Sequence, residues 1–256
     1  MGGRSLSGGN GQVGGLAAHH DGPVARAVFA LSIAALPALA AYHLTGWLSG
    51  LVAGDALAAL AGLALGACAA DLVTGTVHWA CDSWGDERTR WVGAGLIHSF
   101  REHHHRPLAM LDHDWIEVNG QPAVAASAAF GVLALPGVRD WSDEHVLASA
   151  FAWSIVAMSS LANQIHKWAH ARRVPRLVRS LQRAGCILAP ARHARHHRAP
   201  HSTDYCIMGG WLIPALDALG FWRGLERLIT SATGASPRGE PLSSRPPIRP
   251  NEDRTR

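Results

Sequence analysis

Histidine is the residue type whose number and spacing indicate chemistry most strongly in this chain. Twelve of the sixteen histidines fall into two groups that follow apolar segments. The first group comprises His78, His98, His103, His104, His105 and His113, and the second comprises His166, His170, His193, His196, His197 and His201. Imidazole is the commonest protein ligand for transition metals, whereas calcium and magnesium prefer oxygen ligands. The sequence therefore predicts a site for iron, zinc or copper.

Helical spacing places several of these side chains on a common face, because residues three or four apart are neighbours on a helix. The sets with this spacing are His78 with Asp82, His166 with His170, and His193 with His196 and His197. His103 and His104 are adjacent and point in different directions. They could therefore serve two metals, or one metal and the residues that orient its ligands.

A single histidine is weaker support for a metal site. His43 or His145 alone is more typical of a hydrogen-bonded residue near a membrane surface, and His103–His105 alone would fit a solvated polar turn. The repetition of ligand-like spacing in both groups favours metal binding over these interpretations.

The types of ligand favour iron among the transition metals. Carboxylate-bridged di-iron bundles need paired E-x-x-H motifs on facing helices, and only Glu102 and His105 have that spacing within the groups. Structural zinc sites have four ligands, in which cysteine is prominent, and the four cysteines of this chain show no ligand-like spacing. About eight to ten imidazoles suit two iron ions that activate oxygen without strong anionic donors. Nearby carboxylates are candidates for orienting these rings through their second nitrogen: Asp71, Asp82, Glu102, Asp114 and Glu117.

Long apolar segments predict an all-α membrane protein. Only 16% of the residues are charged, against about 25% in a typical soluble domain. Residues 27–48, 51–70, 122–138 and 146–162 are rich in Ala, Leu, Val and Trp. A transmembrane helix needs roughly 20 such residues, so the third and fourth segments reach this length only with their neighbours. We expect about four transmembrane helices with a histidine-rich helical cap.

The distribution of arginine predicts how these helices are oriented. Lys and Arg near helix ends are retained on the cytoplasmic side, and arginines precede the first span, separate the second from the third and follow the fourth. Residues 49–50 are a bare turn, and the loop 139–145 carries three acidic residues with Arg139. Both termini and both histidine groups should therefore face the cytoplasm.

The net charge of +4 suits arginines at anionic lipid head groups. Nucleic-acid binding is disfavoured because no basic stripe is interleaved with aromatic residues on a soluble module. Arginine supplies all but one of the basic residues. Together with abundant alanine, this indicates a GC-rich bacterial genome and hence a multi-pass protein of the bacterial cytoplasmic membrane.

Composition divides the chain into one domain with two polar ends. The composition of the two ends predicts a disordered leader at residues 1–23 and a disordered tail at residues 231–256. We expect residues 24–230 to form the membrane domain. Ala38-Leu39-Ala40 could end a signal peptide, but the leader before the apolar run is too long for one. Residues 211–229 have the pattern of an amphipathic helix on the membrane surface.

Seven strings resemble the plasmanylethanolamine desaturase family in order and spacing over residues 71–228. They are Asp71–Trp79, Asp82–Gly85, Phe100–His104, His113–Gly120, Asn163–His170, His193–His197 and Gly220–Arg223. The resemblance implies a membrane desaturase-like fold and two iron ions. It further implies that the enzyme uses O2 and an external electron donor, such as a small redox protein. Members of the family convert a 1-O-alkyl (plasmanyl) phospholipid into the vinyl ether of a plasmalogen, and plant relatives desaturate an acyl chain of phosphatidylglycerol.

The resemblance also implies which side chains bind the metal. The candidate ligands are His78, His103, His104, His166, His170, His193, His196, His197 and His201. The resemblance adds Asp82 and His113 as candidates for direct or supporting contact, and their positions near the ligands in the sequence add Glu102, Asp114 and Asn163. His98 and His105 lie outside the family pattern, and Arg192 stands where relatives often carry a further histidine.

Two other functions stay open on the sequence alone. The same di-iron site could desaturate or hydroxylate an acyl lipid. A non-enzymatic membrane protein that carries metal or signals is disfavoured, because a path for ions needs polar residues within the spans. The spans offer few beyond Asp55 and Asp71.

Overall fold

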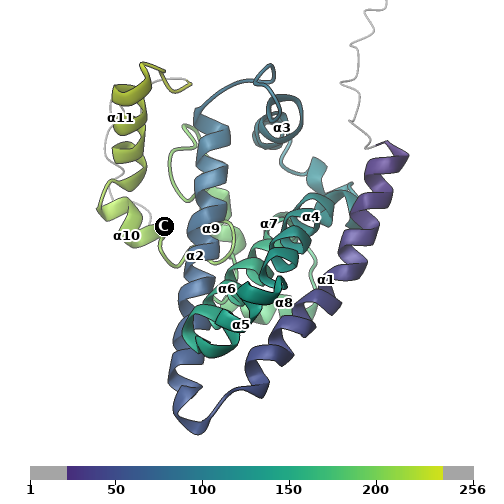
Figure 1. The fold of residues 1–256 in the computed structure, drawn as a ribbon. Coiled ribbons are helices and arrows are strands. Elements are labelled where there is room, and N and C mark those ends of the chain that lie inside the picture. The colour runs from purple at the N-terminus through teal and green to yellow at the C-terminus, as the bar shows by residue number, and fades with distance from the viewer. Residues whose placement is uncertain (1–21, 239–256) are drawn as a thin grey trace, which may run out of the picture.

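The computed structural model describes residues 22–238, and this part of the chain is helical without strands (Figure 1). This confirms the predicted all-α class. Residues 1–21 of the predicted leader and residues 239–256 of the predicted tail lie outside the described residues.

Two long helices open the fold as the arms of a V. Helix α1 (Pro23–Ser49) and helix α2 (Ala56–Ser83) are joined by a short turn that includes the 3₁₀ helix η1 (Ala53–Asp55) (Figure 1). Both are long and apolar enough to cross a membrane. Helix α2 continues 13 residues beyond the predicted end of its span at residue 70 and carries His78 and Asp82 on its last turns.

The remaining apolar helices lie between these arms. Helix α4 (Trp115–Leu133) packs along α1, and α6 (Val146–Ser160) packs along α2. Helix α7 (Ala162–His170) continues α6 after a bend of 44°, and the pair together is apolar enough to form one span. The described residues thus contain two candidate spans, or three with the bent pair. The count of four stays a prediction.

Two segments differ from the sequence-based expectation. Most of the predicted loop 139–145 belongs to a separate helix, α5 (Pro136–Glu144). The predicted helix 211–229 is two helices, α10 (Ile213–Ala218) and α11 (Phe221–Thr233). Gly220 breaks the helix because its φ of 60° lies in the left-handed region, which glycine adopts without steric penalty.

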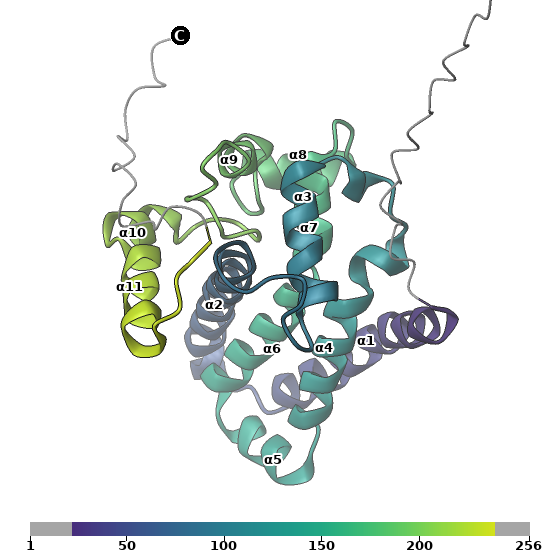
Figure 2. The same ribbon diagram turned by 90° about the horizontal axis from the view of Figure 1, so that it is seen from above.

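Short elements form the cap that holds the histidines. They are the π-helix η2 (Gly93–Ile97), α3 (His98–His105), the 3₁₀ helix η3 (Ala109–Leu111), α8 (Arg176–Arg183) and α9 (Pro190–His196). Helices α3, α7, α8 and α9 gather on one side of the molecule, and α10 and α11 flank α2 on the side away from α1 (Figure 2).

Two apolar clusters fix the cap on the long helices. One joins α7 to α8 and to the segments before and after α9, through Ala162, Ile165, Ala169, Val178, Ile187, Leu188, Ile207 and Met208. The other joins α2 to α10 and α11, through Trp79, Tyr205, Cys206, Ile213, Leu216 and Trp222. The chain around residues 205–208 belongs to both clusters and therefore links α2 to α7.

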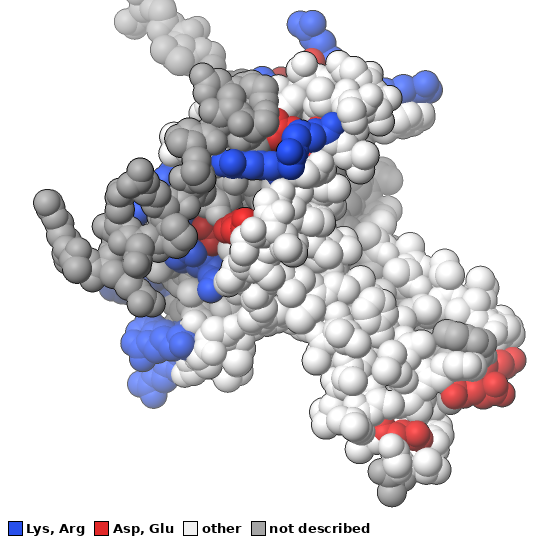
Figure 3. Space-filling view, turned by 90° about the vertical axis from the view of Figure 1, so that its left-hand side faces the viewer, with Lys and Arg blue, Asp and Glu red and all other residues white. Residues whose placement is uncertain are grey.

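Charge is distributed unevenly over the surface. In Figure 3, basic side chains gather toward one end, with some acidic side chains among them. Only acidic side chains are visible at the opposite end, and a broad uncharged surface separates the two ends. This pattern matches a body that is embedded in a bilayer with its arginine-rich end on one side.

Glycines bring α2 and α6 into backbone contact. A Cβ atom on Gly62 would lie 2.4 Å from the Leu147 carbonyl oxygen, and one on Gly66 would lie 2.5 Å from that of Phe151. Ser154 Oγ also donates a hydrogen bond to the Leu63 carbonyl at 2.8 Å. Small residues allow such close helix packing in membranes, where the hydrophobic effect does not drive association.

We predict that Gly66→Ala destabilises the protein by about 1–3 kcal/mol, because the added methyl overpacks this interface. Gly131→Ala is the matched control, since a Cβ there would meet no atom within 4 Å apart from the backbone of its own helix and its chain neighbours. Thermal unfolding in detergent measures both variants. Equal melting temperatures for Gly66→Ala and the wild type would contradict the prediction.

Candidate metal centre

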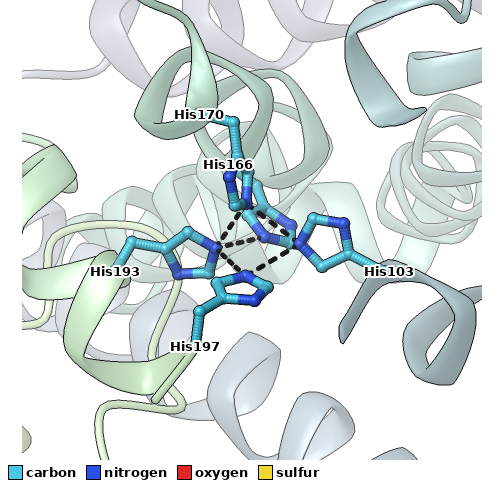
Figure 4. Close-up of side chains that lie close together, drawn as sticks. All are labelled: His103, His166, His170, His193 and His197. Atoms are coloured by element: carbon cyan, nitrogen blue, oxygen red, sulfur yellow. Dashed lines mark hydrogen bonds between the residues drawn. The ribbon is translucent and has the colours of Figure 1, made fainter. Parts of the chain in front are cut away.

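Five imidazole rings converge in the cap (Figure 4). His103 comes from α3, His166 and His170 from α7, and His193 and His197 from α9 and its C-terminal end. One ring nitrogen from each lies within 4.8 Å of the others, and all five side chains are buried or half-buried. We call this set the five-histidine group.

The spacing of these nitrogens fits ligands around a cation. Nε2 of His193 lies 2.7 Å from Nε2 of His166, 2.7 Å from that of His170 and 2.9 Å from that of His197. Nε2 of His103 is 3.0 Å from that of His170 and 3.1 Å from that of His197. A neutral ring nitrogen carries one proton or one lone pair, so mutual hydrogen bonds cannot satisfy all five. Nitrogens about 2.1 Å from a metal at right angles are about 3 Å apart, which matches these distances.

A second set of four side chains lies beside the first: His78, Asp82, His104 and His196. Asp82 Oδ2 lies 3.4 Å from His78 Nε2 and 3.6 Å from both His104 Nε2 and His196 Nε2. The last two nitrogens are 3.0 Å apart. We call this set the Asp82 group.

Several of the atoms that face inward have no hydrogen-bond partner. Both carboxylate oxygens of Asp82 and Nε2 of His78 are buried without one. Leaving such groups buried and unpaired is costly. A cation among the four side chains would satisfy them, so the residues present fit a metal ion.

Backbone carbonyls orient two rings of the Asp82 group. Nδ1 of His78 lies 3.1 Å from the carbonyl oxygen of Tyr205, and Nδ1 of His196 lies 2.8 Å from that of Thr203. Because a carbonyl only accepts, each Nδ1 must donate, and the lone pair is left on Nε2. Both lone pairs therefore point into the group, as in metal-binding histidines whose other nitrogen is held by an acceptor.

Burial lowers the pKa of the histidines that α3 and the α9 segment contribute to these two groups and keeps them neutral. Desolvation, reinforced by neighbouring imidazoles, lowers the pKa of His103 and His104 to about 2 and that of His197 to about 3. Their lone pairs are therefore free for a metal at neutral pH.

The two groups share the same short elements. Adjacent residues of α3 divide between them, since His103 belongs to one and His104 to the other, and the same holds for His197 and His196 at the end of α9. The ring centroids of His104 and His197 are 5.1 Å apart. His103 and His104 thus face different groups, which is the geometry that two separate metals would need.

A known protein family matches most of the chain. Residues 67–240 match the family described as lipid desaturase domain. The chain belongs to the lipid desaturase domain family. It is 38% identical to plasmanylethanolamine desaturase 1 of Mus musculus, over 71% of this chain and 68% of that protein.

Two further relatives extend the comparison. Plasmanylethanolamine desaturase of Myxococcus xanthus is 38% identical over 72% of this chain and 65% of that protein. Chloroplastic fatty acid desaturase 4 of Arabidopsis thaliana is 36% identical over 70% of this chain and 54% of that protein. No solved structure matches this lipid desaturase significantly.

One candidate ligand of the desaturase lies at the edge of the site. His201 is outside both groups, but its ring centroid is 4.6 Å from that of His104. Its Nδ1 contacts the carbonyl oxygen of His196 at 3.0 Å. This contact places His201 beside the Asp82 group.

Other candidates have structural contacts instead. Asp114 caps α4 and pairs with Arg26. Glu117 completes the capping box with Asp114 and lies 3.4 Å from the half-exposed His113. Glu102 pairs with His98 and Arg106, and Asn163 donates to the Val118 carbonyl. Asp71 binds backbone N–H groups. Of the five carboxylates expected to orient imidazoles, only Asp82 lies within the five-histidine group or the Asp82 group.

Sequence reasoning missed the carbonyls of Thr203 and Tyr205. A backbone acceptor has no residue-type signal, because every residue carries one. Only the path of the chain after α9 places these two oxygens beside His196 and His78.

Alanine variants of the three consecutive histidines of α3 test which group each histidine belongs to. His103→Ala should release the metal of the five-histidine group, and His104→Ala that of the Asp82 group. Each loss of affinity should exceed the roughly 10–100-fold that loss of an outer partner costs. His105 is exposed, so His105→Ala is the matched control. Iron content per chain measures all three, and a loss in His105→Ala equal to the other two would contradict the assignment.

Proposed function

We propose that the chain is an oxygen-dependent desaturase that introduces the vinyl ether double bond into a 1-O-alkyl phospholipid, giving a plasmalogen. The observation that carries the proposal is the pair of adjacent ligand groups at the end of α2 and α7. Similarity to two plasmanylethanolamine desaturases supports the substrate.

Two iron ions are the proposed cofactor, one in each group. The five-histidine group supplies only neutral donors, whereas the Asp82 group adds one carboxylate, and His201 is positioned to approach the same ion as His104. Membership of a desaturase family supports iron over zinc, because desaturation is a redox reaction and zinc has no redox chemistry.

When bound, the iron pair would supply the oxidant that removes two hydrogens from the substrate. In the balanced reaction, O2 takes four electrons and four protons to give two water molecules. The alkyl chain provides two electrons and two protons as its C–C single bond becomes a double bond. An external donor provides the other two electrons, and solvent provides the other two protons.

The chain itself must position the lipid and exclude water. Val73 and Val77 are exposed on the last turns of α2 before His78, so hydrocarbon-facing surface reaches to within one turn of the Asp82 group. A lipid tail lying there would approach the site from the bilayer, and its fixed position would determine which C–C bond reacts. Phe100 and Tyr205 contact the His78 ring with centroids 5.0 and 5.9 Å away, which keeps this side of the site apolar.

The arginine-rich surface is the proposed docking site for an acidic small redox protein. Arg176, Arg179 and Arg183 are exposed on α8, which lies between the ligands His170 and His193 along the chain. No Asp or Glu occurs between residues 171 and 203. We propose that this surface and both histidine groups face the cytoplasm of a bacterium, as the arginine distribution predicts.

Lipid analysis tests the reaction. Cells that contain alkyl ether phospholipids but no plasmalogens should form acid-labile vinyl ethers when they express the chain. His197→Ala should reduce the product to background, whereas His105→Ala should retain it. New double bonds confined to acyl chains would instead support the acyl-lipid desaturase, consistent with the similarity to the Arabidopsis protein. Bound iron without any lipid product would support a non-enzymatic role.

Charge reversal tests the docking surface. Arg176→Glu/Arg179→Glu should raise the KM for a reduced acidic ferredoxin about tenfold at low ionic strength, because electrostatic steering is lost. The difference should shrink as salt screens the charges. Arg88→Glu, on the exposed loop after α2, is the matched control. An unchanged KM in the double variant would exclude α8 as the docking site.

A further inference from the structure

Asp71 is a buried carboxylate that takes no part in either ligand group. It lies on α2, two turns before His78, and its side chain is fully buried. Oδ1 accepts hydrogen bonds from the backbone N–H groups of Met208, Gly209 and Gly210 at 3.0–3.2 Å, and Oδ2 accepts one from Trp211 at 3.0 Å.

The four donors form an anion-binding concavity from one stretch of backbone. Consecutive N–H groups converge when a residue adopts a left-handed conformation, and Gly210 has a φ of 69°. Hydrogen bonds to a charged acceptor are stronger than neutral ones. A buried carboxylate without such bonds would be very costly, so Asp71 and this backbone stretch hold each other in place.

The same stretch of chain holds the Asp82 group. Residues 203–211 supply the carbonyls of Thr203 and Tyr205, which orient His196 and His78. Between these carbonyls and the Asp71 contacts, Cys206 packs so closely on Gly75 that a Cβ there would lie 2.8 Å from its Sγ. These contacts fix the position of residues 203–211 along α2, and Asp71 supplies the hydrogen-bond acceptor that holds one end of this segment.

We propose that Asp71 is a positioning residue for the metal bound by the Asp82 group. By fixing residues 203–211 on α2, it sets where the two carbonyls lie and hence where Nε2 of His78 and His196 point. The inference rests on the proposed function, in which that group binds an iron ion. The Nε2 contacts of the five-histidine group are made among α3, α7 and α9, so its ion should depend on Asp71 much less.

Anaerobic titration of the full chain in detergent with Fe(II) tests the proposal. The wild type should bind two ions per chain, Asp71→Ala should lose the ion of the Asp82 group, and Asp71→Asn should bind that ion about tenfold more weakly. Asp55→Asn is the matched control, because Asp55 also accepts a backbone hydrogen bond, from Val52, at the far end of α2. It should bind both ions normally.

Double variants identify which ion is lost, because effects on a shared site are not additive. Asp71→Ala/His104→Ala should retain one ion, like each single variant, whereas Asp71→Ala/His103→Ala should retain none. Wild-type binding of both ions by Asp71→Ala, or equal weakening of both ions in Asp71→Asn, would overturn the proposal. If Asp71→Ala does not fold, the Asp71→Asn titration decides. A wild type that binds no iron would instead contradict the proposed function.

Discussion

The rest of this structure depends on one constraint, which is that buried polar atoms need partners. Eight imidazoles and one carboxylate meet in the cap, and their inward-facing atoms cannot satisfy one another by hydrogen bonding alone. A bound metal ion would resolve this, because a cation accepts lone pairs from every direction. The helices, the apolar clusters and the carbonyls of residues 203–211 together hold these atoms in place.

Long and short helices contribute to this arrangement in different ways. The long helix α2 brings His78 and Asp82 from the apolar body, whereas the short helices α3 and α9 each divide adjacent histidines between the two groups. Short helices suit this role because adjacent side chains diverge by about 100° around the axis. A few helical turns in the cap can therefore supply side chains to two neighbouring candidate sites.

Spacing in the sequence predicted much of the site but less of the fold. The four-residue interval of His166 and His170 indicated a common helical face, because helical periodicity is local. The end of α2 was harder to predict: hydropathy falls after residue 70, but the helix continues because Trp79 and Cys206 pack in a shared cluster. Contacts with backbone groups, such as the four N–H donors around Asp71, could not be predicted. They depend on how segments far apart in the sequence are placed, and every residue type carries the same backbone groups.

The glycine contact between α2 and α6 has a consequence for the cap. Helix α2 carries ligands of one group, and α6 leads directly into α7, which carries ligands of the other. Gly66 lies 12 residues before His78, or roughly 18 Å along the helix. The distance between the two candidate ligand sets thus depends on this remote contact, because one methyl group added at Gly66 would push α2 and α6 apart and move the two sets away from each other.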